Sequence, residues 1–223
     1  MREKTVNFLI ERFERQTFDS LFFLTLIELL ETCLNDDELT ASFHPLGFII
    51  IPLKDWYEGK RFRLHIWPPD HRRYNDNRAW VHSHEYDVDS LIISGRIINY
   101  SFNSSEDSKK CLYPIYQVVY TATNSDLVAT GRFCDVELVK KEILSFGDFY
   151  SIKKWSYHKV DVEEDHIAST LVLNYNKEAT TAFVIGSATT SQTVFPYKRD
   201  VYDVENLKAL IKALISHLQK EIA

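Results

Sequence analysis

The chain of 223 residues has few cysteines and no apolar run long enough to cross a bilayer. Its three cysteines, Cys33, Cys111 and Cys134, are widely spaced and form no CxxC pair, so a disulfide framework is not expected. The most apolar run, Leu21 to Leu30, is too short to span a membrane and contains Glu28. No basic-then-apolar signal peptide opens the sequence. We therefore expect reduced thiols, a cytoplasmic location and no membrane association.

An excess of positive charge is also lacking. The formal net charge of -6 argues against general nucleic-acid binding. The chain has no internal repeat and no low-complexity segment. A Ser/Thr-rich stretch at residues 186–193 holds one glycine, which cannot form the backbone nest of a phosphate-binding loop. A nucleotide-binding loop is therefore not expected there.

Apolar residues recur at intervals of three and four in three segments, which predicts helices at residues 3–15, 18–34 and 203–222. Thr17 or Asp19 could cap the second helix, and Asp203 could cap the third. The C-terminal helix is amphipathic. We expect it to pack on the protein's own sheet, although it could also seal a homodimer.

The chain between these helices is strand-like. In the run from Arg61 to Trp67, Arg61, Arg63, His65 and Trp67 share one strand face and the apolar residues share the other. A chain of this length can form one β-rich core. We expect a single domain over residues 1–223, with helices in 1–36, a barrel at 43–195 and a helix at 203–222.

Two stretches supply histidines with a spacing that suits a metal site. His82 and His84 are two residues apart, so on an extended strand both imidazoles point to the same side. A second stretch runs from Gly147 to His158. Together they could place three neutral nitrogen donors around a divalent metal. The alternative is three ordinary polar histidines. His44 is expected to close a turn.

These stretches resemble the two motifs of the cupin superfamily. The first motif runs HxH, glutamate, glycine, and the distance from His84 to Gly95 matches its usual spacing. The second has a glycine eleven residues before a histidine, as do Gly147 and His158. The resemblance covers roughly residues 60–176. It implies a mostly β fold, the cupin double-stranded β-helix or jelly roll, with His82, His84 and His158 as metal ligands.

The chain departs from the cupin motif at the glutamate, whose position falls on Val88. A three-histidine site is then implied, unless Asp87 or Asp89 substitutes. Among cupins, this loss is similar to the thiol dioxygenases, whose iron is held by three histidines. The resemblance implies Fe(II) as the cofactor, with Zn, Mn or Ni as alternatives.

The same resemblance suggests residues that contact the substrate. In thiol dioxygenases an arginine on an early strand holds the substrate carboxylate, and Arg63 is the best-placed counterpart. His65 and Trp67 share its strand face, and Tyr86 follows the HxH motif, so these four are candidates for substrate binding. The alternative is that this face lies on the outside of an edge strand.

Four tyrosines are candidate hydrogen-bond donors near bound oxygen: Tyr86, Tyr150, Tyr157 and Tyr175. Tyr175 keeps the spacing of the family's tyrosine, but Leu171 and Leu173 replace the serine and histidine that precede it. These leucines share a strand face with Tyr175, so a slip of one residue in the alignment would turn Tyr175 away from the site.

The function expected from these features is that of a mononuclear metal-dependent cupin. An Fe(II) dioxygenase acting on a small, anionic or thiol-containing molecule is the first hypothesis. Two others stay open. One is a non-catalytic cupin that binds a metal, ligand or partner. The other is an isomerase or hydrolase assisted by Zn or Mn.

Overall fold

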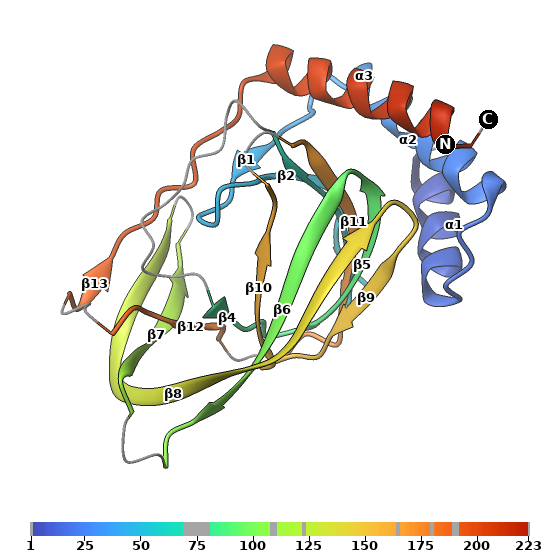
Figure 1. The fold of residues 1–223 in the computed structure, drawn as a ribbon. Helices are drawn as coiled ribbons and strands as arrows, with labels where there is room; N and C mark the ends of the chain where they lie inside the picture. The colour runs from blue at the N-terminus through green and yellow to red at the C-terminus, as the bar shows by residue number, and fades with distance from the viewer. Residues whose placement is uncertain are drawn as a thin grey trace.

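The computed structural model describes residues 2–68, 81–107, 111–121, 124–163, 166–178, 181–188 and 192–222, with only the backbone described at 2 and 55–57. Its described helices are α1 (Arg2–Glu14), α2 (Ser20–Leu34) and α3 (Val204–Glu221). Figure 1 shows all three together on one side of the strands, with both chain termini there. None of these helices is long and apolar enough to cross a membrane.

The described strands form two antiparallel sheets. The first sheet has the order β1 (Ser42–Phe43), β2 (Ile49–Tyr57), β3 (Lys60–Trp67), β11 (Ala168–Tyr175), β5 (Asp87–Ser94) and β9 (Phe149–Ile152). The second has the order β13 (Val194–Phe195), β8 (Ser125–Ser145), β6 (Arg96–Ser105), β10 (Tyr157–Asp161), β4 (Val81–His82), β12 (Phe183–Ile185) and β7 (Tyr113–Tyr120).

The strand order is that of a jelly roll. Among the described strands, β3 pairs with β11, β4 with β10, β5 with β9, and β6 with β8. The pairing is nested: each pair lies, in sequence, inside the pair named before it. Nested antiparallel pairs divided between two sheets form the double Greek key of a jelly roll. The predicted mostly β jelly roll with N-terminal helices and a C-terminal helix is confirmed.

The helices cover the outer face of the first sheet. On β3, Phe62, Leu64 and Ile66 join one buried cluster with residues of all three helices, among them Phe13, Phe22 and Leu207. Two carboxylates fix where the second and third helices begin. Asp19 accepts a hydrogen bond from the Phe22 amide at 3.0 Å, and Asp203 accepts one from the Asn206 amide at 2.9 Å.

The other face of β3 points between the two sheets. Trp67 packs there with Ala168 and Ile92 of the first sheet, with Phe48 just before β2, and with Ile97 of the second sheet. Side chains alternate along a strand, so Arg63 and His65 face the same interior as Trp67. The alternative that this face lies on the outside is therefore wrong.

Candidate metal centre

Three histidines converge between the sheets. His82 ends β4, His158 lies opposite it on β10, and His84 follows two residues after His82. The ring centroids are 4.4 Å apart for His82 and His158, 4.9 Å for His82 and His84, and 5.1 Å for His84 and His158. One nitrogen from each ring lies within 4.8 Å of the others. The structure brings together the residues that the spacing predicts, and the group could hold a metal ion.

The residue between the two histidines explains why both rings point to the same side. The Ser83 amide donates to the Phe183 carbonyl at 2.8 Å, and Ser83 Oγ accepts from the Phe183 amide at 3.1 Å. Ser83 is thereby tied to β12. Beyond it, the His84 carbonyl accepts from the Trp155 amide at 2.8 Å. The Ser83 backbone is therefore held by β12 and the His84 backbone by the turn before β10, which holds the imidazoles in place.

The environment of the cluster favours neutral rings. Burial lowers the pKa of His84 and of His158 well below the usual value, and neighbouring imidazoles lower both further. A metal ligand must be an unprotonated nitrogen, so this environment suits metal binding. The Nε2 atoms of His84 and His158 are 2.9 Å apart. Two ligands at right angles, each about 2.1 Å from an ion, would be separated by about 3 Å.

A neighbouring amide orients one of the candidate ligands. His158 Nδ1 lies 3.3 Å from Asn99 Oδ1, and both side chains are buried. An amide oxygen accepts only, so this contact places the His158 proton on Nδ1 and leaves Nε2 free to bind a metal. Asn99 is a residue that the sequence reasoning missed. It lies on β6, and no local pattern connects it to a histidine on β10.

No carboxylate of the described residues joins this group. Val88 is buried against Ile152 and Val172 on the interior face of β5. Asp87 and Asp89 lie on the opposite strand face. The Lys154 amide donates to Asp87 at 2.9 Å, and the Ser151 hydroxyl donates to Asp89 at 2.5 Å. The alternative in which one of these aspartates replaces the glutamate ligand therefore has no support in the geometry.

Arg63 is a buried cation beside the cluster. Its side chain faces the interior, and the residue is only 8% exposed. Its Nη2 donates to the Tyr86 hydroxyl over 3.5 Å, and Nε has no hydrogen-bond partner. No carboxylate among the described residues forms a salt bridge with it. A buried guanidinium in this state is costly unless a ligand neutralises it.

The other residues predicted to contact substrate divide into two groups. Tyr86 stacks on the His84 ring, with centroids 5.2 Å apart and planes at 24°. His65 and Trp67 instead pack on the Phe48 ring, at 4.7 and 4.8 Å. Tyr86 therefore borders the histidines directly, whereas His65 and Trp67 belong to an aromatic group that buttresses the interior.

Of the four candidate tyrosines, Tyr157 and Tyr175 are turned away from the histidines. Tyr157 directly precedes His158 on β10, so it lies on the other strand face, where it packs with Cys134 and Val81. Tyr175 packs with the helix-covered cluster that contains Leu171 and Leu173. The predicted roles of these two tyrosines at the site are wrong, because strand alternation directs both side chains outward.

Tyr150 faces the interior but occupies a different part of it. It lies opposite Ser90 on β5 and packs against the apolar clusters that contain Ile92 and Val88. Burial raises the pKa of its hydroxyl to about 12. The group is therefore a neutral hydrogen-bond donor at neutral pH. Its role at the site stays a prediction.

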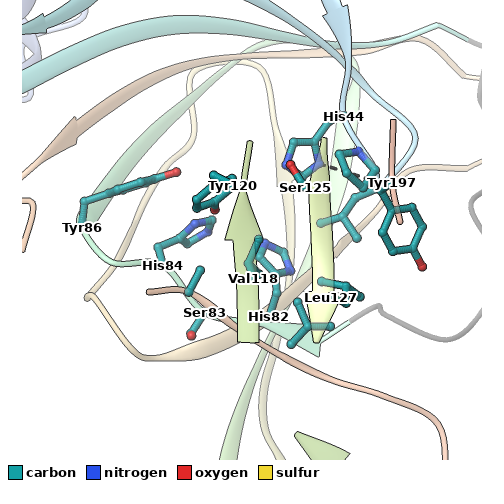
Figure 2. Close-up of a pocket in the computed structure, with 14 residues that line it drawn as sticks. His44, His82, Ser83, His84, Tyr86, Val118, Tyr120, Ser125, Leu127 and Tyr197 are labelled. Atoms are coloured by element: carbon teal, nitrogen blue, oxygen red, sulfur yellow. Dashed lines mark hydrogen bonds between the residues drawn. The ribbon is translucent and has the colours of Figure 1, made fainter. Parts of the chain in front are cut away.

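A pocket opens beside the histidines (Figure 2). It encloses an empty volume of about 630 Å³, part of it open to solvent. His44, His82 and His84 line it together with aromatic side chains and an apolar wall formed by Val118, Leu127, Ala182 and Val184. The wall comes from β7, β8, β12 and the residue before β12. The pocket can therefore hold a compact organic molecule next to the histidines.

Comparisons with known proteins add little to this description. No family model matches the chain, and no curated protein matches it. Among solved structures, the chain is similar to hydroquinone 1,2-dioxygenase from Sphingomonas sp. TTNP3, determined with 4-hydroxybenzoate bound. The TM-score is 0.33 with 12% identity over 58% of this chain and 66% of that chain, slightly under two thirds. A likeness of this size establishes no kinship, and the fold assignment rests on the strand order.

Proposed function

We propose that the protein binds one divalent metal ion through His82, His84 and His158. The convergence of three buried or partly buried imidazoles on one point carries the proposal. Nitrogen ligands of this kind suit Fe(II), Zn, Ni and Cu(II). We propose Fe(II), because three neutral ligands without a carboxylate resemble the iron site of thiol dioxygenases.

We further propose an oxygenase activity on a small molecule. Once bound, the ion would offer open positions at which oxygen and a substrate could bind side by side. The chain's own contribution is to position the substrate and exclude water. The apolar wall would hold the body of the molecule against the histidines. Positioning the reactants in this way lowers the entropic cost of bringing them together for the reaction.

The substrate is proposed to carry a negative charge. Arg63 is buried, faces the interior and has no acidic partner among the described residues. A guanidinium binds a carboxylate through two parallel hydrogen bonds. Tyr86 accepts one hydrogen bond from Arg63 and stacks on His84, so it connects the proposed anion site to the metal ligands.

Binding without turnover is the second candidate. The outward orientation of Tyr157 and Tyr175 favours it, because it removes two of the four predicted hydrogen-bond donors from the site. In that case the protein would hold a metal and a ligand but would consume no oxygen.

Two measurements on the full chain separate these candidates. The first is the metal content of protein purified without added metal, compared between the wild-type chain and a His82→Ala, His84→Ala, His158→Ala variant. The second is oxygen uptake by the Fe(II)-loaded chain with a panel of small thiols and carboxylates. Metal that depends on the histidines, together with substrate-dependent oxygen uptake, supports the oxygenase. Histidine-dependent metal without uptake supports the binding protein. Equal metal content in both chains rejects the proposed centre.

A further inference from the structure

The pocket is also lined by the imidazole of His44, which the metal site does not use. It lies in the turn between β1 and β2. The His44 amide donates to the Phe48 carbonyl at 2.7 Å, and the Gly47 amide donates to the His44 carbonyl at 2.9 Å. Gly47 has a φ of 87°, a conformation that glycine adopts without strain. The His44 ring also stacks on Phe48, with centroids 4.3 Å apart and planes at 16°. The position and tilt of the ring are therefore fixed.

One hydrogen bond determines which nitrogen of His44 carries the proton. The Leu46 amide lies 3.2 Å from His44 Nδ1. A backbone N–H only donates, so Nδ1 must accept and cannot be protonated. The neutral ring then holds its proton on Nε2. His44 therefore offers an N–H donor at the edge of the ring opposite the Leu46 bond.

That edge faces the pocket. Figure 2 shows the ring of His44 with one nitrogen engaged by the dashed hydrogen bond and the opposite edge directed into the space that His82 and His84 also border. His44 lines the same pocket as these two candidate metal ligands. A molecule that extends from the metal centre into this pocket would therefore meet the His44 donor.

We infer that the His44 turn is a subsite for a hydrogen-bond-accepting oxygen of the ligand that binds at the three-histidine centre. The inference rests on the proposed metal site and defines part of its ligand. That ligand would be a compact molecule whose body is apolar, because Val118, Leu127, Ala182 and Val184 form the adjoining wall. It would carry an oxygen with a free lone pair, such as a carbonyl or ionised hydroxyl group, within reach of His44 Nε2–H. His44 is a positioning residue in this scheme, since it orients the ligand and does not bind the metal.

The subsite can be tested with azide as a probe on the Co(II)-loaded full chain. Azide binds to an open metal position, and its far end accepts hydrogen bonds. Its affinity is read from the visible spectrum of the cobalt, and the cobalt content is measured separately. His44→Phe keeps a flat ring on Phe48 but removes the donor. His44→Gln keeps an N–H group near the position of Nε2. His166→Phe, at an exposed site, is the control for loss of a histidine.

We expect His44→Phe to bind cobalt as the wild-type chain does but to bind azide about tenfold more weakly, the effect of losing one hydrogen bond to an anion. His44→Gln should restore the affinity to within about threefold of wild type. Equal azide affinity in the wild-type and His44→Phe chains would overturn the inference, as would a His44→Gln chain as weak as His44→Phe. If the wild-type chain binds no cobalt, the proposed metal site fails, and the subsite fails with it.

A second measurement does not depend on whether a His44 variant folds. In the metal-free chain labelled with ¹⁵N at histidine, the nitrogen shifts report which ring nitrogen is protonated. The resonances of His44 are assigned as those lost in His44→Gln, or by through-bond connection to its backbone if that variant does not fold. A protonated Nε2 and an unprotonated Nδ1 support the inference. The opposite tautomer contradicts it, because Nε2 would then have no proton to donate.

Discussion

His158 lies directly opposite His82 across the antiparallel pairing of β10 and β4. The two ring centroids are 4.4 Å apart. This single pair joins the two motif-like stretches of the chain, and His84 completes the group from the same side. The metal site therefore depends on the register between two short strands, and changes that disturb this register should affect metal binding before they affect the helix-covered core.

The first prediction concerns Asn99. Replacing Asn99 with Ala removes the acceptor for His158 Nδ1–H, so the ring loses its fixed tautomer and orientation. We expect metal affinity to fall about 10- to 100-fold, the usual cost of losing a partner of a ligating histidine. Competition with a fluorescent chelator measures the metal affinity of each chain. Asn103→Ala, at an exposed position of the same strand, should bind metal like the wild-type chain. Equal affinity in both variants would show that Asn99 does not orient His158.

The second prediction concerns the missing carboxylate. Val88→Glu would place a carboxylate on the interior face of β5, at the position of the cupin glutamate. We expect the metal-free variant to lose stability, because an unpaired buried carboxylate is costly. Added Mn(II) or Fe(II) should raise its melting temperature more than that of the wild-type chain, since a fourth, oxygen ligand becomes available. An equal metal-induced shift in both chains would mean that Val88 does not adjoin the site.

The third prediction is a loss of stability in acid. The pKa of His84 and of His158 is lowered in the folded chain, so at low pH the unfolded chain binds protons that the folded chain does not. The free energy of unfolding of the metal-free protein should be flat above the unfolded pKa near 6.5. Below it, stability should fall by up to about 1.4 kcal/mol per pH unit for each of the two histidines. Urea titrations between pH 5 and 8 measure the free energy of unfolding. In a His158→Gln chain this free energy should fall less steeply as the pH is lowered.

The fourth prediction concerns Arg63. Arg63→Leu should leave metal content unchanged and should not lower the melting temperature, because it removes a buried charge without an acidic partner among the described residues. It should abolish turnover of an anionic substrate. Arg96→Leu, which removes a surface arginine paired with Glu163, is the matched control and should keep turnover. Unchanged turnover in Arg63→Leu would remove the basis for an anionic substrate.

Much of the fold and the histidine group could be predicted from the sequence. Local periodicity predicts the helices and the strand faces, and the resemblance to the two cupin motifs implies the jelly roll and its three histidines. The helices follow from apolar spacing, and Asp19 and Asp203 fulfil their predicted capping roles. Strand alternation also placed Arg63 with His65 and Trp67 on one face. The sequence left open which face was interior, because that depends on where the helices pack.

The tyrosines show where sequence reasoning was insufficient. Tyr157 directly precedes His158, and alternation alone was enough to direct it away from the site. Tyr175 was placed by family spacing, and in the structure it shares the outer face with Leu171 and Leu173. Asn99 could not be found, because it reaches His158 only through the pairing of β6 and β10, which are distant in the chain. His44 was expected only to close a turn, and its place in the pocket beside His82 and His84 depends on how distant parts of the chain pack together.

The central claim is that His82, His84 and His158 together bind one metal ion without a carboxylate. A crystal structure of the Fe(II)-loaded chain, with anomalous data collected at the iron absorption edge, tests it most directly. The account predicts a single strong anomalous peak about 2.1 Å from one nitrogen of each of the three rings. A peak elsewhere, or one bonded to Asp87 or Asp89, would contradict it.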